Sequence, residues 1–300
     1  MDHKAFLKSL SPAERARLTQ LSDAAGLAHF TLHLGLIVAL SAYVWAGFWL
    51  WPLAMLGAGI AMVFLFTLLH ETVHFTPFRT RWINLGVGLV CGVLLGLGPL
   101  WFRYFHLAHH RFTQDRERDP ELAQPKPATR RAYLWHLTGL PTWRDQGLTL
   151  IKNAFFDVRA AYIPDRRIAA IRIEARLILA AYVAIATASV LFAWTWVFWL
   201  WIGPLLLGQP FLRAYLLAEH AQCDHGTDMF ANTRTTFTTA LIRFLAWNMP
   251  YHAEHHAWPT VPFHALPRLH ELAREHLGIT EDGYVRFHRS YATKLPNGQE

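Results

Sequence analysis

Hydrophobic residues along the chain are gathered into five long runs separated by polar segments. The runs cover residues 28–48, 50–69, 82–101, 177–195 and 196–217. Each is long and apolar enough to lie in a lipid bilayer as a helix. Only Trp49, Trp51 and Pro52 mark the boundary between the first two runs, and the last two meet near Trp194–Trp196. These short turns predict two transmembrane helical hairpins, so we expect an all-α, multi-spanning membrane protein.

The middle run, residues 82–101, requires a separate interpretation because histidine clusters flank it at 70–74 and 106–110. If both clusters bind one metal centre, they must lie on the same side of the membrane, whereas a single crossing would separate them. We therefore expect this run to form a re-entrant or interfacial helix. Small-residue spacings that allow close helix packing support this expectation. The glycines concerned are Gly86, Gly88, Gly92, Gly96 and Gly98. The alternative is an ordinary glycine-rich span with no shared metal site.

The polar segments predict an orientation and a division into parts. The stretch 111–176 is rich in Lys and Arg, which favours the cytosolic side of the membrane. We expect both termini and the histidine clusters to be cytosolic as well, with the clusters carried by a helical cap. The expected parts are a cytosolic N-terminal segment (1–27), a membrane domain (28–290) and a loose C-terminal tail (291–300).

The composition agrees with a membrane location. Hydrophobic residues make up 53% of the 300 residues and charged residues only 16%, whereas a soluble domain carries about 25% charged residues. The formal net charge of +7 would suit nucleic acid or an anionic membrane surface. Because the apolar runs decide for the membrane, we expect no nucleic-acid partner. Two cysteines, Cys91 and Cys223, provide neither a disulfide framework nor a Cys-rich zinc module.

Histidine is the most unusual feature of the composition, because eight of the 18 histidines form three compact clusters. These are His70 and His74; His106, His109 and His110; and His252, His255 and His256. Spacings of three and four residues place the rings of each cluster on one face of a helix. Burying so many polar rings near a bilayer is costly unless they bind something, so the clusters predict a metal site. Imidazole suits Zn, Cu, Fe and Ni, and eight rings exceed what one tetrahedral zinc needs, which favours two metal ions.

The three clusters in this order, H-x3-H and then two H-x2-H-H motifs far apart, resemble the integral-membrane fatty acid desaturase superfamily. They are also similar to related hydroxylases and alkane monooxygenases. Flanking residues strengthen the resemblance, which covers roughly residues 45–275. These are Arg111–Asp115, Asp119–Glu121, Asn248–Tyr251, Trp258-Pro259 and Val261-Pro262.

The resemblance implies two non-haem iron ions, O2 as oxidant and a lipid acyl chain as substrate, with desaturation as the leading reaction. It also implies nine histidine ligands, the ninth from the polar segment after the last run. We favour His220, since Glu219-His220 resembles the alkane-oxidising relatives, and His225 is the alternative. Nearby carboxylates are expected to orient the ligand rings. The candidates are Glu71, Glu219, Glu254, Asp115 and Asp119, with Asn248 as a possible contact to the metal through water.

Other functions stay open at this point. The first cluster spells H-E-x-x-H, the zinc protease signature with Glu71 as general base, so an intramembrane metalloprotease is an alternative. A non-enzymatic metal- or haem-carrying membrane protein is another. Within the oxidative reactions, hydroxylation or terminal oxidation is the alternative to desaturation. Because the sequence contains no haem-binding H-P-G-G motif, we expect electrons from a separate ferredoxin-, rubredoxin- or cytochrome b5-type donor with its reductase.

Overall fold

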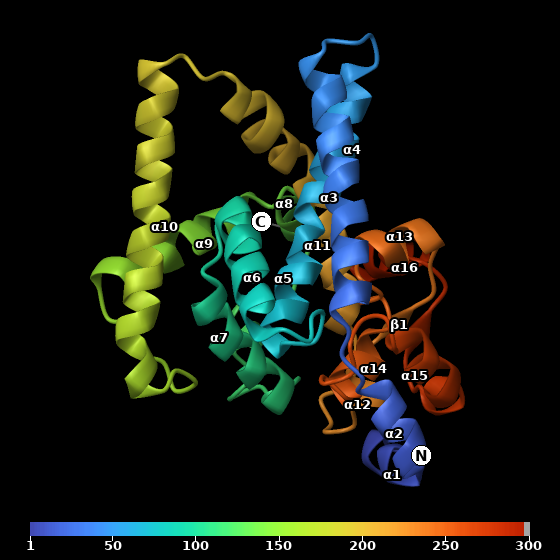
Figure 1. The fold of residues 1–300 in the computed structure, drawn as a ribbon. Helices are drawn as coiled ribbons and strands as arrows, with labels where there is room; N and C mark the ends of the chain where they lie inside the picture. Colours follow the sequence, from blue (N-terminus) through green and yellow to red (C-terminus); the bar gives the residue numbers. More distant parts are fainter. Residues whose placement is uncertain (297–300) are drawn as a thin grey trace.

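Helices make up nearly all of the regular structure in the computed structural model, which describes residues 1–296 (Figure 1). The α-helices are α1 (His3–Ser9), α2 (Pro12–Leu18), α3 (Asp23–Trp45), α4 (Trp51–Val63), α5 (Leu65–His74), α6 (Arg81–Leu95), α7 (Pro99–Phe112), α8 (Arg130–Leu137), α9 (Leu140–Phe155), α10 (Asp165–Leu191), α11 (Gly203–His220), α12 (Met229–Asn232), α13 (Ala240–Leu245), α14 (His252–Ala257), α15 (Leu266–Ala273) and α16 (Tyr284–Lys294). Short helical turns are η1 (Pro120–Ala123), the π-helical η2 (Phe198–Ile202) and η3 (Arg274–His276). Within the described residues, the β structure is one parallel pair, β1 (Thr235–Thr236) with β2 (Thr280–Glu281). The all-α prediction is confirmed.

Two helical stretches are long and apolar enough to cross a membrane, Pro12–Trp45 and Trp51–His74. The first contains α3, and the second joins α4 to α5 through Phe64. α3 packs against α4 after a turn at residues 46–50, as expected for the first hairpin. The second stretch extends beyond the apolar run and ends at His74. The first histidine cluster therefore lies at the end of the helical stretch that begins with α4.

The middle apolar run is broken into α6 and α7, which are bent by 97° relative to each other. Gly96 ends α6 in the left-handed conformation with φ of 78°, and Pro99 begins α7. A left-handed glycine and a proline at the first helical position favour a sharp break at this point. Gly92 packs against Leu97 and Pro99 so closely that a Cβ there would collide with them. This break allows the clusters on either side of the run to meet in one site.

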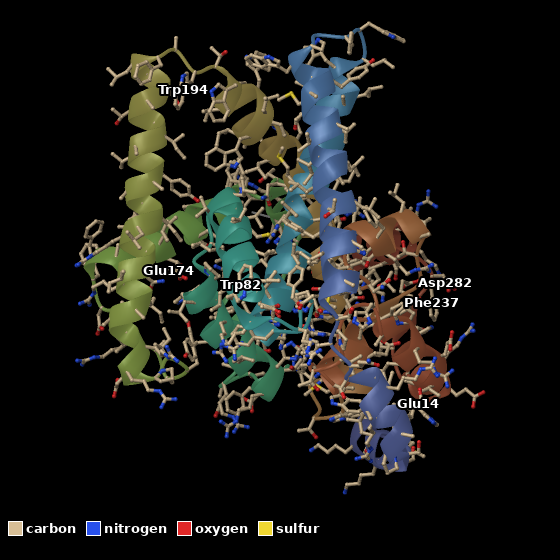
Figure 2. The ribbon with its side chains drawn as sticks, in the orientation of Figure 1. Glu14, Trp82, Glu174, Trp194, Phe237 and Asp282 are labelled. Carbon is tan, nitrogen blue, oxygen red and sulfur yellow. The ribbon has the colours of Figure 1, made fainter. Side chains whose placement is uncertain are left out.

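The second predicted hairpin differs from the first. The chain climbs along α10, turns near Trp194 at the end of the molecule opposite Glu14 (Figure 2), and returns through η2 and α11. Its two legs are splayed, because α10 packs on α9 and α7 whereas α11 packs on α4. Gly59 on α4 and Gly208 on α11 let those two backbones touch. Within residues 1–296, neither α10 nor α11 is both long and apolar enough to count as a membrane-crossing helix. Helix length and composition therefore support the first predicted hairpin but not the second.

The N-terminus of the chain lies at the histidine-bearing end of the molecule, near α12, α14 and α15 (Figure 1). The N-terminal helices α1 and α2 lie beside α12 and α15, where His3 Nδ1 is 2.9 Å from Asp228 Oδ1 and Arg268 Nε donates to Glu14 at 3.0 Å. The segment 120–167 contains η1, α8 and the longer α9, which packs on α10.

The C-terminal segment is more ordered than the sequence predicts. α16 extends to Lys294, and the side chains of Tyr291 and Leu295 are buried in a small cluster with Leu217 of α11. The prediction of a loose tail from residue 291 is therefore wrong for residues 291–296, because this stretch buries an aromatic and an apolar side chain. Residues 297–300 lie outside the described residues.

Candidate metal centre

Four helices bring the three histidine clusters together with His220. The first cluster is at the C-terminal end of α5, the second at the end of α7, and the third fills most of α14. His220 is the last residue of α11. All nine rings are buried except that of His74, which is partly buried. Segments far apart in the sequence therefore share one site inside the fold.

Five histidines form a first group. Its members are His70, His74, His106, His110 and His255. One ring nitrogen of each lies within 4.8 Å of the corresponding nitrogens of the others. The Nε2 atoms of His106 and His110 are only 2.9 Å apart, and the ring centroids of His70 and His106 are 4.2 Å apart. Imidazole nitrogens that converge in this way can surround one transition-metal ion.

A second group surrounds His220. One ring nitrogen each of His109, His220 and His256 lies within 4.8 Å of the other two. His252 adds a fourth ring, because its Nε2 atom is 3.1 Å from Nε2 of His220. The Nε2 atom of His109 lies 3.2 Å from the same His220 atom. His225, the alternative to His220, is exposed and directs Nδ1 to the carbonyl of Gln114 at 3.1 Å. His220, and not His225, therefore lies with the rings of the three clusters.

Adjacent histidines divide between the two groups. His110 belongs to the first group and His109 to the second, and likewise His255 to the first and His256 to the second. Consecutive residues of a helix point about 100° apart, so an H-H pair can serve two neighbouring sites. The groups are in direct contact, since the rings of His110 and His256 stack at 4.0 Å between centroids. The arrangement offers places for two metal ions side by side.

Unpaired ring nitrogens provide a test of whether these residues fit a metal. Within residues 1–296, both ring nitrogens of His70 and of His255 and the Nε2 atom of His256 are buried without a hydrogen-bond partner. A neutral imidazole carries one N–H and one lone pair, and leaving either unpaired in a buried position is costly. Metal ions that accept the convergent lone pairs would remove this cost, so the residues fit a metal centre.

Comparison of the sequence with known proteins identifies the family of this chain. The fatty acid desaturase family matches residues 43–289, a range that contains all nine histidines. The chain belongs to the fatty acid desaturase family. It is similar to the sphingolipid delta(4)-desaturase DES1 of Drosophila melanogaster, with 27% identity over 236 residues, which cover 76% of this chain and 67% of that protein. The resemblance inferred from the three clusters is confirmed, and the chain is assigned as an oxidoreductase of lipid metabolism.

Burial fixes the protonation state of the third cluster of this desaturase-family protein. It lowers the pKa of His252, His255 and His256 well below the usual value for histidine, because the charged form loses its hydration. α14 lies outside the membrane-compatible stretches. These rings are therefore neutral near pH 7, which is the form that offers a lone pair to a metal.

Two predicted carboxylates contact rings of the second group. Asp119 accepts from Nδ1 of His109, with distances of 2.9 and 3.1 Å to its two oxygens. Glu219 Oε1 lies 3.4 Å from Nδ1 of His252. In both pairs the carboxylate faces Nδ1 and leaves Nε2 directed at His220. Such contacts fix the orientation of a ligand ring and make it a better electron donor.

Glu71 contacts the first group more weakly. Its Oε2 accepts the hydroxyl of Thr76 at 3.0 Å and the backbone N–H of Phe263 at 3.1 Å. Its Oε1 is 3.8 Å from Nδ1 of His255, beyond hydrogen-bond distance. Glu71 therefore joins α5 to the segment after α14 and only adjoins the ring of His255.

The other three predicted residues face away from both groups. Asp115 pairs with Arg118 at the surface. Glu254 contacts Nδ1 of His270, because its position on α14 directs it away from the histidine face of that helix. Asn248 donates to a backbone carbonyl. The expectations that Asp115 and Glu254 orient ligand rings, and that Asn248 reaches a metal through water, find no support in these contacts.

Two supporting side chains were not singled out from the sequence. Glu121 Oε2 lies 3.3 Å from Nδ1 of His109, so two carboxylates approach that ring together with Asp119. The hydroxyl of Thr113 is 3.1 Å from Nδ1 of His256 and donates to the carbonyl of His109 at 2.7 Å. Both positions lie within the flanking sequence that resembles the family, but nothing in the spacing alone distinguishes them from surface residues.

An apolar cavity of about 640 Å³ lies between α4, α11, α13 and α16. Its lining includes Phe64, Phe211, Tyr215 and Leu245. The hydroxyl of Tyr215 is buried with no hydrogen-bond partner in residues 1–296. Along α11, Tyr215 is five residues before His220, about 7.5 Å of helix axis. One wall of the cavity is therefore on the same helix as His220, and the cavity has the size of a small-molecule site.

Proposed function

We propose that the nine histidines hold two iron ions and that the protein uses O2 to introduce a double bond into a lipid acyl chain. The observation that carries the proposal is the division of the two H-H pairs between two adjoining groups. When bound, the iron pair supplies the O2 activation needed to remove hydrogen from an unactivated C–H bond. The reaction consumes one O2, two electrons and two protons for each alkene formed and releases two molecules of water.

The chain's own residues position the substrate and exclude water. The cavity beside Tyr215 is lined almost wholly by apolar side chains, which suits an acyl chain and not a peptide. Tyr215 is one helical turn before Glu219, whose carboxylate faces His252. In this proposal a chain in the cavity would lie along α11, with one end directed toward Glu219 and the second histidine group.

The metalloprotease alternative agrees less well with this geometry. A zinc protease needs the carboxylate of H-E-x-x-H free to activate water at the metal. Glu71 instead uses Oε2 for Thr76 and Phe263, and six further histidines would have no role. Hydroxylation or terminal oxidation of the same chain is the second candidate. It is favoured by the same histidine groups, because alkene or alcohol formation depends on how the chain is held.

Electrons must come from a separate protein in this proposal, of ferredoxin, rubredoxin or cytochrome b5 type, together with its reductase. Because the histidine end carries the Lys- and Arg-rich segments, an acidic donor is the expected class. We also propose a multi-pass topology with both termini and the histidine groups in the cytosol. The basis is the charge of the stretch 111–176 and the hairpin of α3 and α4.

Labelling of single cysteines tests this topology. Arg79→Cys and Arg116→Cys flank the α6–α7 pair and are exposed, and Trp49→Cys lies in the α3–α4 turn with 83% of its surface exposed. The native Cys91 and Cys223 are buried. The first two variants should react from the cytosolic side and the third from the opposite side. Reaction of the first two from opposite faces would contradict the shared site.

The metal content and the lipid products test the reaction. The purified full-length protein should contain two iron ions per chain and no haem. Expression in a host that lacks unsaturated lipids, with O2 and a competent donor, should yield alkenes in the lipid extract. Alcohols in place of alkenes would establish the hydroxylase alternative. One zinc ion per chain with peptide cleavage in the absence of O2 would overturn the proposal.

A further inference from the structure

The bend between α6 and α7 leaves backbone groups that need partners outside both helices. α6 ends at Leu95 and α7 begins at Pro99. The last carbonyls of one helix and the first N–H groups of the next have no partner within their own helix. Gly98, the N-cap of α7, has no side chain that could accept from these N–H groups. Leaving such groups unpaired in an apolar environment is costly, so the partners must come from elsewhere in the chain.

Glu174 on α10, labelled in Figure 2, supplies the partner at the start of α7. Its carboxylate accepts the backbone N–H of Leu100, with distances of 3.0 and 3.1 Å from the nitrogen to its two oxygens. The backbone N–H of Trp101 acts on the same carboxylate. A negative charge is favourable at this end of a helix, because the helix dipole is positive there. A side chain 74 residues further along the chain therefore takes the place of a local N-cap.

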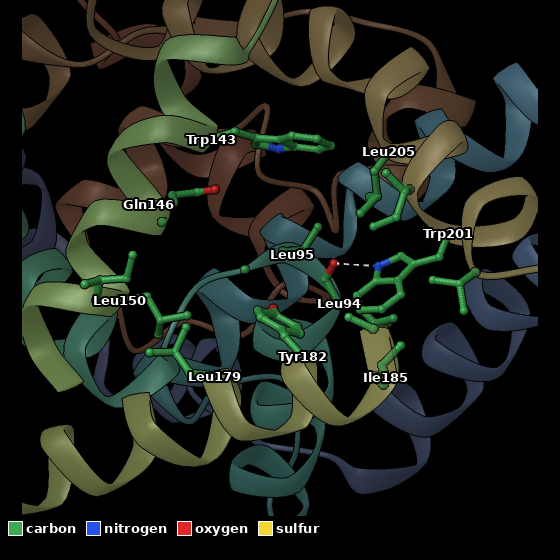
Figure 3. A pocket seen from close by; sticks show the side chains of 16 residues that line it. Leu94, Leu95, Trp143, Gln146, Leu150, Leu179, Tyr182, Ile185, Trp201 and Leu205 are labelled. Atoms are coloured by element: carbon green, nitrogen blue, oxygen red, sulfur yellow. Dashed lines mark hydrogen bonds between the residues drawn. The ribbon is translucent and has the colours of Figure 1, made fainter. Parts of the chain in front are cut away.

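Side chains of α10 and η2 contact the other side of the bend. The hydroxyl of Tyr182 donates to the carbonyl of Val93, and Nε1 of Trp201 donates to the carbonyl of Leu94 at 2.9 Å (Figure 3). Both carbonyls belong to the last turn of α6. The two rings also form part of the wall of an apolar cavity of about 450 Å³. The segment from α10 to η2 therefore binds both helix ends that meet at the bend.

Two arginines close to Glu174 in the sequence bind the end of another helix. Arg176 Nε donates to the carbonyl of Ala154 at 2.9 Å, and Arg172 Nη2 donates to the carbonyl of Phe156 at 3.1 Å. Both carbonyls lie at the C-terminal end of α9, where the helix dipole favours positive charge. α10 thus places an acid at the start of α7 and bases at the end of α9, so the sign of each charge fits the helix end that it contacts.

We propose that Glu174 is a positioning residue for the two histidine groups, because it anchors the start of the helix that supplies rings to both. α7 carries His106 and His110 of the first group and His109 of the second. Leu100 precedes His106 by six residues, about 9 Å of helix axis, so a helix anchored at its start holds these rings in place. The consequence for iron rests on the proposed function, whereas the anchoring contact itself does not.

Hydrogen exchange of the metal-free, full-length protein in lipid nanodiscs tests the anchor without any metal. In Glu174→Ala, the amides of Leu100 and Trp101 should exchange about tenfold faster or more, because they lose a charged hydrogen-bond acceptor. Glu174→Gln keeps one acceptor oxygen and should restore part of the protection. Asp165→Asn removes an exposed carboxylate from the same helix and should exchange as the wild type does. Unchanged exchange in Glu174→Ala would overturn the proposal.

Gly98→Ala probes the same contact from the side of α7. A Cβ at this position would lie 2.8 Å from Oε2 of Glu174, the flexible end of that side chain. The φ of Gly98 is −64°, which alanine adopts freely, so the substitution should act by displacing the carboxylate. Exchange in the first turn of α7 should rise in Gly98→Ala, and the same substitution should add nothing in a Glu174→Ala background. An equal increase in both backgrounds would show that the effect does not pass through Glu174 and would contradict the anchor.

Iron titration of the metal-free protein tests whether the anchor positions the rings. Glu174→Ala should bind iron about tenfold more weakly, because binding must then also order α7. Arg176→Met loosens the end of α9, which carries none of the clustered histidines, so this matched control should keep the wild-type affinity. Apolar packing of Leu100 and Trp101 against a cluster that includes Ile171 should keep both variants folded.

Wild-type iron affinity in Glu174→Ala, or an equal loss in Arg176→Met, would overturn the positioning role. A wild type that binds no iron would overturn the proposed function itself, whereas the exchange measurements would still decide whether Glu174 anchors α7.

Discussion

The two histidine groups differ in what holds their rings. In the first group the nearest carboxylate, Glu71, stays 3.8 Å from His255, and two ring nitrogens of His70 have no partner within residues 1–296. In the second group Asp119 contacts His109 at 2.9 Å. Glu121, Glu219 and Thr113 approach rings of the same group.

This contrast has a structural origin. The first group is built mainly from α5 and α7, whose positions are fixed by packing of apolar residues around the bend between α6 and α7. The second group depends on loop residues and on the end of α11, where polar contacts must do the positioning. We therefore expect the second group to be more sensitive to the loss of hydrogen bonds, and both groups to be equally sensitive to the loss of a ligand.

The largest effect should follow removal of a ring from either group. His74→Ala and His256→Ala should each abolish lipid oxidation, because no neighbouring side chain can replace the lost nitrogen. Iron analysis of the purified, membrane-inserted variants should show fewer than two ions per chain in both. If both variants kept near-normal activity, the two-group arrangement would not be the reaction centre.

The next largest effect is expected from Asp119→Asn. The amide removes the negative charge that faces Nδ1 of His109, and loss of such a contact lowers metal affinity or activity by about 10–100-fold. Titration of iron into the metal-free protein would measure the change. Asp115→Asn, at the surface on the same loop, is the control and should behave as the wild type. An Asp119→Asn variant with unchanged iron binding would remove the proposed difference between the groups.

Glu71→Gln should have a smaller effect, near the lower end of that range, because Glu71 lies 3.8 Å from His255. We expect measurable lipid oxidation and somewhat weaker iron binding, with His70→Ala as the inactive control. The assay needs iron, O2 and an electron donor. If Glu71→Gln were as inactive as the control while holding its full iron content, a direct role in the reaction would replace the orienting role.

Thr113→Val should have the smallest effect of the series. A neutral hydrogen bond contributes about 1 kcal/mol, so iron affinity should fall only about fivefold. Thr113→Ser keeps the hydroxyl that faces His256 and should restore the wild-type affinity. A loss as large as that of Asp119→Asn, or no rescue by serine, would show that Thr113 acts through packing and not through this hydrogen bond.

The sequence pointed to the histidines that meet in the fold but not to the contacts around their rings. The cluster spacings identified eight of the nine histidines that the structure brings together, because spacings of three and four residues are read directly as one helical face; the family resemblance pointed to the ninth, His220. The carboxylates were less predictable. Asp119 and Glu219 face ligand rings whereas Glu254, inside the third cluster, faces His270. Proximity in sequence did not decide this; the direction of each side chain on its helix did.

The sequence by itself determined the helical class, the first hairpin and the three histidine clusters, since these depend on run length, apolar composition and local periodicity. The tertiary structure decided how distant segments meet. Gly92 and Pro99 let the chain bend between α6 and α7, and Gly59 draws α11 to α4, which splays the second hairpin. Those close approaches depend on which surfaces pack together, and so does the burial of Arg213. A linear pattern records that a glycine or an arginine is present, but only the packed chain specifies what lies opposite it.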